Sequence, residues 1–207
     1  YALKRSKGFL QLMRPANIIT SVADVLAGIA VSGYLVNENF SQNYIFPITL
    51  LIISSIGLYG GGVVLNDVFD AELDKIERPE RPIPKAIISI REASFLGIIL
   101  LLAGIIAAAL LSELSGLLAL SIAVAALTYD KWLKHNALAG PLNMGLCRGL
   151  NLLLGISIVT SSVASWWFLS IVPVIYIAAI TMISRGEVHG GSKRILFSAA
   201  FLYCIVI

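Results

Sequence analysis

The chain has 207 residues, of which 58% are hydrophobic and only 13% are charged, and its mean hydropathy is +0.90. A soluble domain carries about 25% charged residues, so these values exclude a soluble protein and indicate a helical membrane protein with several spans. The net charge of +3 is small. It fits a protein oriented in a lipid bilayer and argues against a nucleic-acid partner.

Seven apolar segments are predicted to span the membrane, the last of them incomplete. They are roughly Ala16–Val36, Tyr44–Leu65, Ala93–Leu111, Leu114–Thr128, Leu138–Ser161, Trp166–Ile183 and Ile195–Ile207. The fourth segment is short, because a span needs about 17 residues or more. The third and fourth segments could therefore form one broken hairpin around Ser112 and Glu113. No linker or repeat divides them, so residues 1–207 are expected to form a single transmembrane domain.

The positive charges of the chain segregate between the predicted spans. All fifteen Lys and Arg residues except Arg148 fall before the first span or in every second loop. Lys and Arg concentrate in cytoplasmic loops of membrane proteins. The N-terminus and the loops after the second, fourth and sixth spans are therefore predicted to be cytoplasmic.

An acidic stripe follows the second span. Asp67, Asp70, Asp74 and Glu77 are spaced i, i+3, i+7 and i+10, which places four carboxylates on one helical face. Such like charges repel one another unless a cation lies among them. Mg²⁺ takes hard oxygen ligands and completes its shell with water and phosphate oxygens. The stripe is therefore interpreted as a platform for Mg²⁺ and a diphosphate, and the alternative is a solvated helix end.

The segment after the stripe is rich in arginine and proline. Arg78 and Arg81 are candidates to bind phosphate oxygens in a bidentate manner, and the alternative is that they only orient the protein toward anionic lipid. The prolines at positions 79, 82 and 84 are expected to prevent a long helix and to form a stiff, extended cap.

The fifth predicted span contains an arginine. Arg148 and Asn151 are spaced i, i+3 and share a face. Because an arginine at mid-bilayer costs at least about 2.5–3.5 kcal/mol, Arg148 should face the bundle interior with a partner. It is predicted either to reach the diphosphate or brace the carboxylates, or to form a structural ion pair with Asp24 of the first span. Gly57 and Gly61 of the second span suit close helix packing.

The run from Asn66 to Asp74, NDVFDAELD, resembles the NDxxDxxxD signature of the UbiA superfamily of intramembrane prenyltransferases, and the RPERPIP run from Arg78 to Pro84 resembles its continuation. The resemblance covers essentially the whole chain. It implies an all-helical bundle of nine spans, so about two are expected to be missing at the C-terminus. It also implies that Asp67, Asp70 and Asp74 bind Mg²⁺ and that Asn66 contacts the substrate.

Other positions are similar to the family less completely. The family has a Tyr-x-x-x-Lys element after its fourth span, whereas the lysines here lie two and five residues after Tyr129. Lys134 is the preferred phosphate ligand and Lys131 the alternative. The run of Arg148, Gly149 and Asn151 also looks like the family, and Asn17 would line its central cavity.

The second aspartate motif of the family is altered. The sequence here is SRGEVHGG, in which Glu187 is the only carboxylate, and Ile183 stands four residues before it. Glu187 is the expected ligand of a second Mg²⁺, with Arg185 beside it to bind the diphosphate. His189 could bind substrate or metal but is more typical of an interface. The variant resembles a divergent, EboC-like subgroup.

The resemblance implies Mg²⁺-dependent transfer of a prenyl group from an isoprenoid diphosphate to a hydrophobic acceptor, aromatic in most of the family. The catalytic residues it implies are Asp67, Asp70, Asp74, Lys134, Arg148 and Glu187. The alternative is a membrane scaffold or transporter that binds isoprenoid lipid without catalysis, and the altered second motif favours it.

Overall fold

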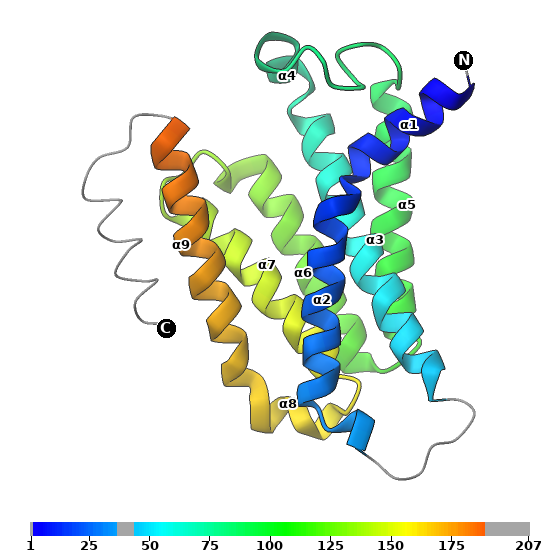
Figure 1. The fold of residues 1–207 in the computed structure, drawn as a ribbon, viewed down its shortest axis with the longest axis vertical. Helices are drawn as coiled ribbons and strands as arrows, with labels where there is room; N and C mark the ends of the chain where they lie inside the picture. The colour runs from blue at the N-terminus through cyan, green and yellow to red at the C-terminus, as the bar shows by residue number, and fades with distance from the viewer. Residues whose placement is uncertain (1, 37–43, 189–207) are drawn as a thin grey trace.

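The computed structural model describes residues 2–36 and 44–188, and these form an all-helical bundle (Figure 1). The elements are α1 (Ala2–Met13), α2 (Pro15–Val31), η1 (Tyr34–Val36), α3 (Ile45–Phe69), α4 (Ala71–Glu77), α5 (Ile90–Ala109), α6 (Glu113–Thr128), η2 (Tyr129–Leu133), α7 (Ala139–Ile156), α8 (Thr160–Trp166), η3 (Trp167–Ser170) and α9 (Ile171–Val188). The predicted all-helical membrane fold is confirmed. The predicted span Ile195–Ile207 lies outside the described residues.

Long apolar helices make up most of the bundle. Within the described ranges, four helical stretches are long and apolar enough to cross a membrane, or five if the bent pair α1 and α2 counts as one span. Helix α7 is not among them, and its interior carries Asn143, Arg148 and Asn151. Its polar residues face other helices: Asn143 donates to the carbonyl of Ala125 in α6 over 2.7 Å, and Asn151 to that of Ser21 in α2 over 2.7 Å.

The third and fourth predicted spans are two separate helices, α5 and α6, joined by a tight turn. Ser112 caps α6, and its hydroxyl accepts the N–H of Ser115 over 3.0 Å. Ser89 begins α5 with a capping box, because Ser89 and Glu92 each accept the other's backbone N–H. The single broken hairpin considered above is therefore replaced by an antiparallel pair with its own start signals.

Helices α3 and α5 pack almost backbone to backbone. A Cβ atom at Gly57 would lie 2.5 Å from the carbonyl oxygen of Leu100, and one at Gly61 would lie 2.8 Å from that of Gly97. Only glycine permits such an approach, so the predicted packing role of both residues is confirmed.

Helix α1 was not predicted, because its basic residues lower its hydropathy and the predicted elements were found as apolar segments. It is bent by 44° from α2 (Figure 1), and the hinge residue Arg14 has a left-handed backbone with φ 50°. Pro15 follows at the first position of α2, where its missing N–H costs nothing. Leu12 of α1 packs on buried Ile83 and Ile88, which fixes the segment between α4 and α5 against the bundle.

Candidate functional site

A cavity of about 680 Å³ opens between α2, α3, α6, α7 and α9. Its end near α4 is polar and includes Asn66, Asp70 and Lys134, whereas Ile122 and Ile177 belong to its apolar wall. The predicted site residues Asn17, Tyr129, Arg148 and Asn151 also line it. The cavity thus joins the acidic stripe to the polar residues of α7, which are far apart in the sequence.

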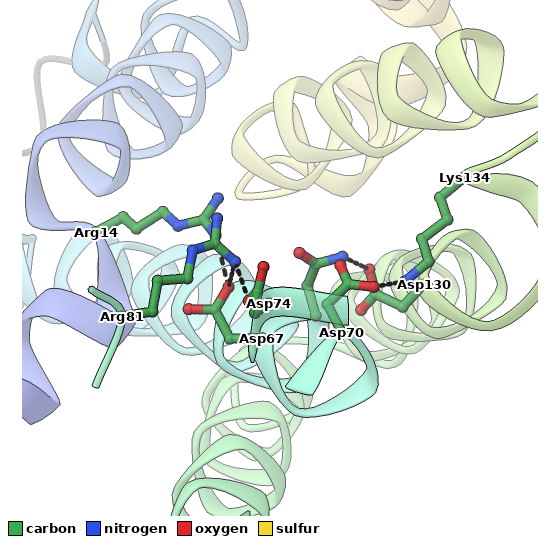
Figure 2. A network of polar contacts seen from close by, with 8 residues as sticks. Arg14, Asp67, Asp70, Asp74, Arg81, Asp130 and Lys134 are labelled. Atoms are coloured by element: carbon green, nitrogen blue, oxygen red, sulfur yellow. Dashed lines mark hydrogen bonds and ion pairs between the residues drawn. The ribbon is translucent and has the colours of Figure 1, made fainter. Parts of the chain in front are cut away.

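The acidic stripe is divided by a break in the helix at Asp70, which ends α3 and precedes α4 with φ −90° and ψ 3°. On one side of the break, Arg81 lies 2.9 Å from Asp67 and 2.5 Å from Asp74 (Figure 2). Asp67 and Asp74 are each only 4% exposed, which argues against a solvated face. Glu77 is exposed, as expected for a solvated helix end.

Asp70 faces the cavity and pairs with Lys134 from the other side (Figure 2). The N–H of Lys134 donates to the carbonyl of Tyr129 over 2.9 Å, so the helix makes a π-turn here. A π-turn contains one more residue than an α-turn. Lys134, five residues after Tyr129, therefore occupies the position that a lysine four residues after the tyrosine would occupy in a regular α-helix. This explains the unusual spacing and favours Lys134 over Lys131, which is exposed and lies 4.7 Å from the ring centre of Trp132.

The segment after α4 is folded into turns and is not the extended cap that was predicted. The backbone N–H of Arg81 donates to Arg78, and that of Lys85 donates to Arg81. The three prolines do prevent a helix, but these turns direct Arg81 back onto the carboxylates. Arg78 is exposed, whereas Arg81 is held by Asp67 and Asp74. Neither arginine is among the residues that line the cavity, and neither are Asp67 and Asp74.

Arg14 is a site residue that sequence reasoning missed. Its guanidinium lies 2.6 Å from Asp67, and its side chain lines the cavity (Figure 2). A non-glycine residue with a left-handed backbone costs about 1–3 kcal/mol and is often found at functional sites. The signal in the sequence was the Arg-Pro pair at the start of the first span, which was interpreted only as a topological charge.

Arg148 forms the ion pair with Asp24 that was considered as its structural alternative. Its Nε lies 2.8 Å from Asp24 Oδ2, in ion-pair contact though not aligned as a hydrogen bond. Its terminal nitrogens donate to the hydroxyl and carbonyl oxygens of Thr20 over 3.3 and 3.2 Å. Arg148 therefore binds α2 and does not brace the acidic stripe, although it also lines the cavity.

The altered second motif is described only in part. Arg185 and Glu187 belong to the last turn of α9, of which the structure describes the backbone and not these two side chains. His189 and Cys204 lie outside the described residues. Asp130, His135 and Cys147 line the cavity as well and had not been singled out as site residues.

The chemistry of this end of the cavity fits Mg²⁺. Within the described ranges, no three acidic, histidine or cysteine side chains converge closely enough to hold one metal ion together. Mg²⁺ commonly uses only one or two carboxylates, however, and takes its other oxygens from water and phosphates. Asp67, Asp70 and Asp74 are paired with Arg14, Arg81 and Lys134 across this end of the bundle. A diphosphate that draws these cations to its own oxygens would leave the carboxylates without partners, and Mg²⁺ can then hold them.

Comparisons with known proteins agree with the motifs. The model of the UbiA prenyltransferase family matches residues 25–191. A digeranylgeranylglyceryl phosphate synthase from Sulfurisphaera tokodaii is 34% identical over 179 residues, which are 85% of this chain and 60% of the relative. One from Methanothrix thermoacetophila is 36% identical over 146 residues, 70% of this chain and 52% of the relative. The chain thus spans between half and two thirds of the length of these relatives.

Solved structures share the fold. A UbiA homologue from Archaeoglobus fulgidus, bound to DMAPP and Mg²⁺, superposes with a TM-score of 0.76 at 20% identity, over 96% of this chain and 75% of that one. A structure concerned with digeranylgeranylglyceryl phosphate synthase in membranes gives a TM-score of 0.78 at 22% identity, over 98% and 75%. The named relatives are not EboC-like, so the resemblance to that subgroup is corrected.

Proposed function

The chain belongs to the UbiA prenyltransferase family, and from this premise we propose that its protein transfers an isoprenyl group from an isoprenyl diphosphate to an acceptor within the membrane. The observation that carries the proposal is the placement of polar residues at one end of a cavity that also has an apolar wall; the polar residues are Asn66, Asp70, Arg14 and Lys134, and the wall includes Leu58, Val63, Ile122 and Ile177. A charged diphosphate and a long apolar chain require these two environments side by side.

The donor diphosphate is proposed to bind at the polar end. Lys134 and Arg14 each have a carboxylate partner and also line the cavity, so both can donate to phosphate oxygens when their partners turn to a metal ion. Arg81 holds Asp67 and Asp74 in place behind them. Asp70 and Asn66 would hold Mg²⁺, with Asp67 and Asp74 next to them. Bound Mg²⁺ would neutralise the diphosphate as its negative charge develops.

The isoprenyl chain is proposed to lie against the apolar wall. The bond between its first carbon and the diphosphate oxygen breaks, and the allylic cation is stabilised by nearby aromatic rings. Tyr59, Tyr129 and Tyr176 line the cavity and are the described aromatic residues placed to do this. Glu187 and Arg185 remain candidates for a second metal and the diphosphate.

The acceptor is proposed to be a glyceryl phosphate lipid, in place of the aromatic acceptor expected from the sequence. The relatives reported above are named digeranylgeranylglyceryl phosphate synthases, a name that describes a glyceryl phosphate with two geranylgeranyl groups. The step then forms a bond from the first carbon of geranylgeranyl to an acceptor hydroxyl oxygen. The hydroxyl proton leaves to the released diphosphate. Arg148 and Asn151 would contact polar atoms of the acceptor deeper in the cavity.

Labelled geranylgeranyl diphosphate tests this proposal. The full-length protein in membranes would be given this donor, Mg²⁺ and either a geranylgeranyl glyceryl phosphate or an aromatic acceptor. We expect diphosphate release and a doubly prenylated lipid with the glyceryl phosphate only. Prenylation of the aromatic acceptor alone would overturn the acceptor assignment. Saturable binding of the donor with no diphosphate release under any condition would favour the non-catalytic scaffold.

A further inference from the structure

Asp130 is a buried carboxylate at the polar end of the cavity that the mechanism above does not use. It is 4% exposed and lies in the π-turn between Tyr129 and Leu133. Its Oδ1 accepts a hydrogen bond from the side-chain nitrogen of Asn66 over 2.8 Å. Its Oδ2 is buried and has no hydrogen-bond partner among the described residues. A buried acceptor without a partner costs about 1–3 kcal/mol, so stability alone does not account for a carboxylate here.

The surroundings of Asp130 tie it to the donor site. Figure 2 shows Lys134, which directly follows the π-turn, paired with Asp70 beside Asp130. Asn66 precedes Asp67 at the end of α3 and lines the cavity together with Asp70. The π-turn η2 therefore places Asp130 against Asn66 at the end of α3, and it places Lys134, which follows the turn, against Asp70 at the helix break.

The hydrogen bond to Asp130 orients the amide of Asn66. The amide nitrogen donates to Asp130 Oδ1, so the amide oxygen, which can only accept, is turned away from Asp130. An oxygen fixed in this way is a suitable ligand for Mg²⁺, whereas a freely flipping amide would present its nitrogen part of the time.

We propose that Asp130 is a positioning residue that holds the amide of Asn66 so that its oxygen is presented to the Mg²⁺–diphosphate complex. This inference rests on the proposed function, because it concerns the same donor site. Hydrogen-bond partners of metal ligands act in this way, and their loss typically costs 10- to 100-fold in metal affinity. Asp130 does not itself contact the substrate; its effect passes through Asn66.

A double-mutant cycle on the full-length protein tests the proposal. The variants are Asn66→Ala, Asp130→Ala and the double variant, and Asp130→Leu fills the space without an acceptor oxygen if Asp130→Ala does not fold. The readout is Mn²⁺ affinity, measured by electron paramagnetic resonance with a non-reactive thiolodiphosphate analogue of the donor. We expect each single variant to weaken Mn²⁺ binding by about 10- to 100-fold. The double variant should be no weaker than Asn66→Ala alone, because Asp130 acts only through Asn66.

Two results would overturn the inference. Effects that multiply in the double variant would show that Asp130 acts independently, as a direct ligand or through its charge. Wild-type affinity in Asp130→Ala, or in Asp130→Leu where that variant is used, would show that the contact is only structural. Absence of Mn²⁺ and analogue binding in the wild type would instead contradict the proposed function itself, so the two failures are distinguishable.

Discussion

The two charged regions of the bundle differ in how their charged groups are paired and in whether those pairs face the cavity. At the stripe end, Arg81 is shared between Asp67 and Asp74, and the paired Asp70 and Lys134 line the cavity. Deeper in the bundle, one carboxylate, Asp24, pairs with one arginine, Arg148, whose remaining donors contact Thr20. The first region is arranged to exchange partners with a ligand, and the second mainly joins α2 to α7. Substitutions that remove a charge should therefore reduce activity at the stripe end and reduce stability at the Asp24–Arg148 pair.

The largest effect is expected for Asp70→Asn. The change removes a carboxylate that faces the cavity, so the charge that develops on the diphosphate loses metal support. We expect turnover to fall by about 10²- to 10³-fold with little loss of thermal stability. Glu77→Gln is the matched control, because Glu77 belongs to the same stripe but is exposed. Equal losses in both variants would contradict the distinction, and diphosphate release measures it.

Lys134→Met should weaken binding of the donor by about 10- to 100-fold, since a hydrogen bond to a charged group contributes roughly 1.5–3 kcal/mol. Lys131→Met is the control, because that lysine is exposed and lies beside Trp132. Equilibrium binding of an isoprenyl diphosphate compares them. A larger effect at Lys131 would show that the π-turn does not select the lysine.

Arg148→Met should destabilise the protein by about 2 kcal/mol. This is less than the 3–5 kcal/mol typical of a fully buried pair, because both side chains keep about a fifth of their surface exposed. Asp24→Asn with Arg148→Met should cost less than the sum of the single changes. Unfolding in detergent measures this. Additive losses would show that the two groups do not depend on each other.

The smallest effect is expected where no charge is involved. Gly61→Ala should destabilise the bundle by about 1–2 kcal/mol, because its Cβ would lie 2.8 Å from the carbonyl oxygen of Gly97. Gly60→Ala is the control, since the nearest atom to its Cβ would be the flexible end of Met13 at 3.4 Å. Thermal unfolding distinguishes them. A more stable Gly61→Ala variant would contradict the close packing of α3 and α5.

Patterns local in the sequence predicted the fold better than the contacts of the site. The apolar segments predicted the long helices α2, α3, α5, α6, α7 and α9 to within several residues, because the bilayer imposes long apolar runs. The residue types of Asp67, Asp70 and Asp74 indicated the acidic platform. The break at Asp70 was not predictable, because the stripe has the same spacing whether or not the helix continues.

Contacts between distant segments were the part that sequence reasoning could not give. Arg14 reaches Asp67 across 53 positions, and Asp130 reaches Asn66 across 64. Neither contact produces a spacing pattern in the sequence from which it could be predicted. The spacing of Tyr129 and Lys134 departed from the family element, and only the π-turn shows how the lysine regains its position. The pairing of Asp24 with Arg148 was open to prediction because few charges lie within the spans.

The stripe end is proposed to bind an isoprenyl diphosphate through a metal ion. The most direct test is the affinity of the full-length protein for a geranylgeranyl thiolodiphosphate, measured over a Mg²⁺ titration and with the metal removed by EDTA. We expect Mg²⁺ to tighten binding at least about tenfold in the wild type and in Glu77→Gln, and to have little effect in Asp70→Asn. Equal affinity with Mg²⁺ and with EDTA, or an unchanged metal response in Asp70→Asn, would contradict the account.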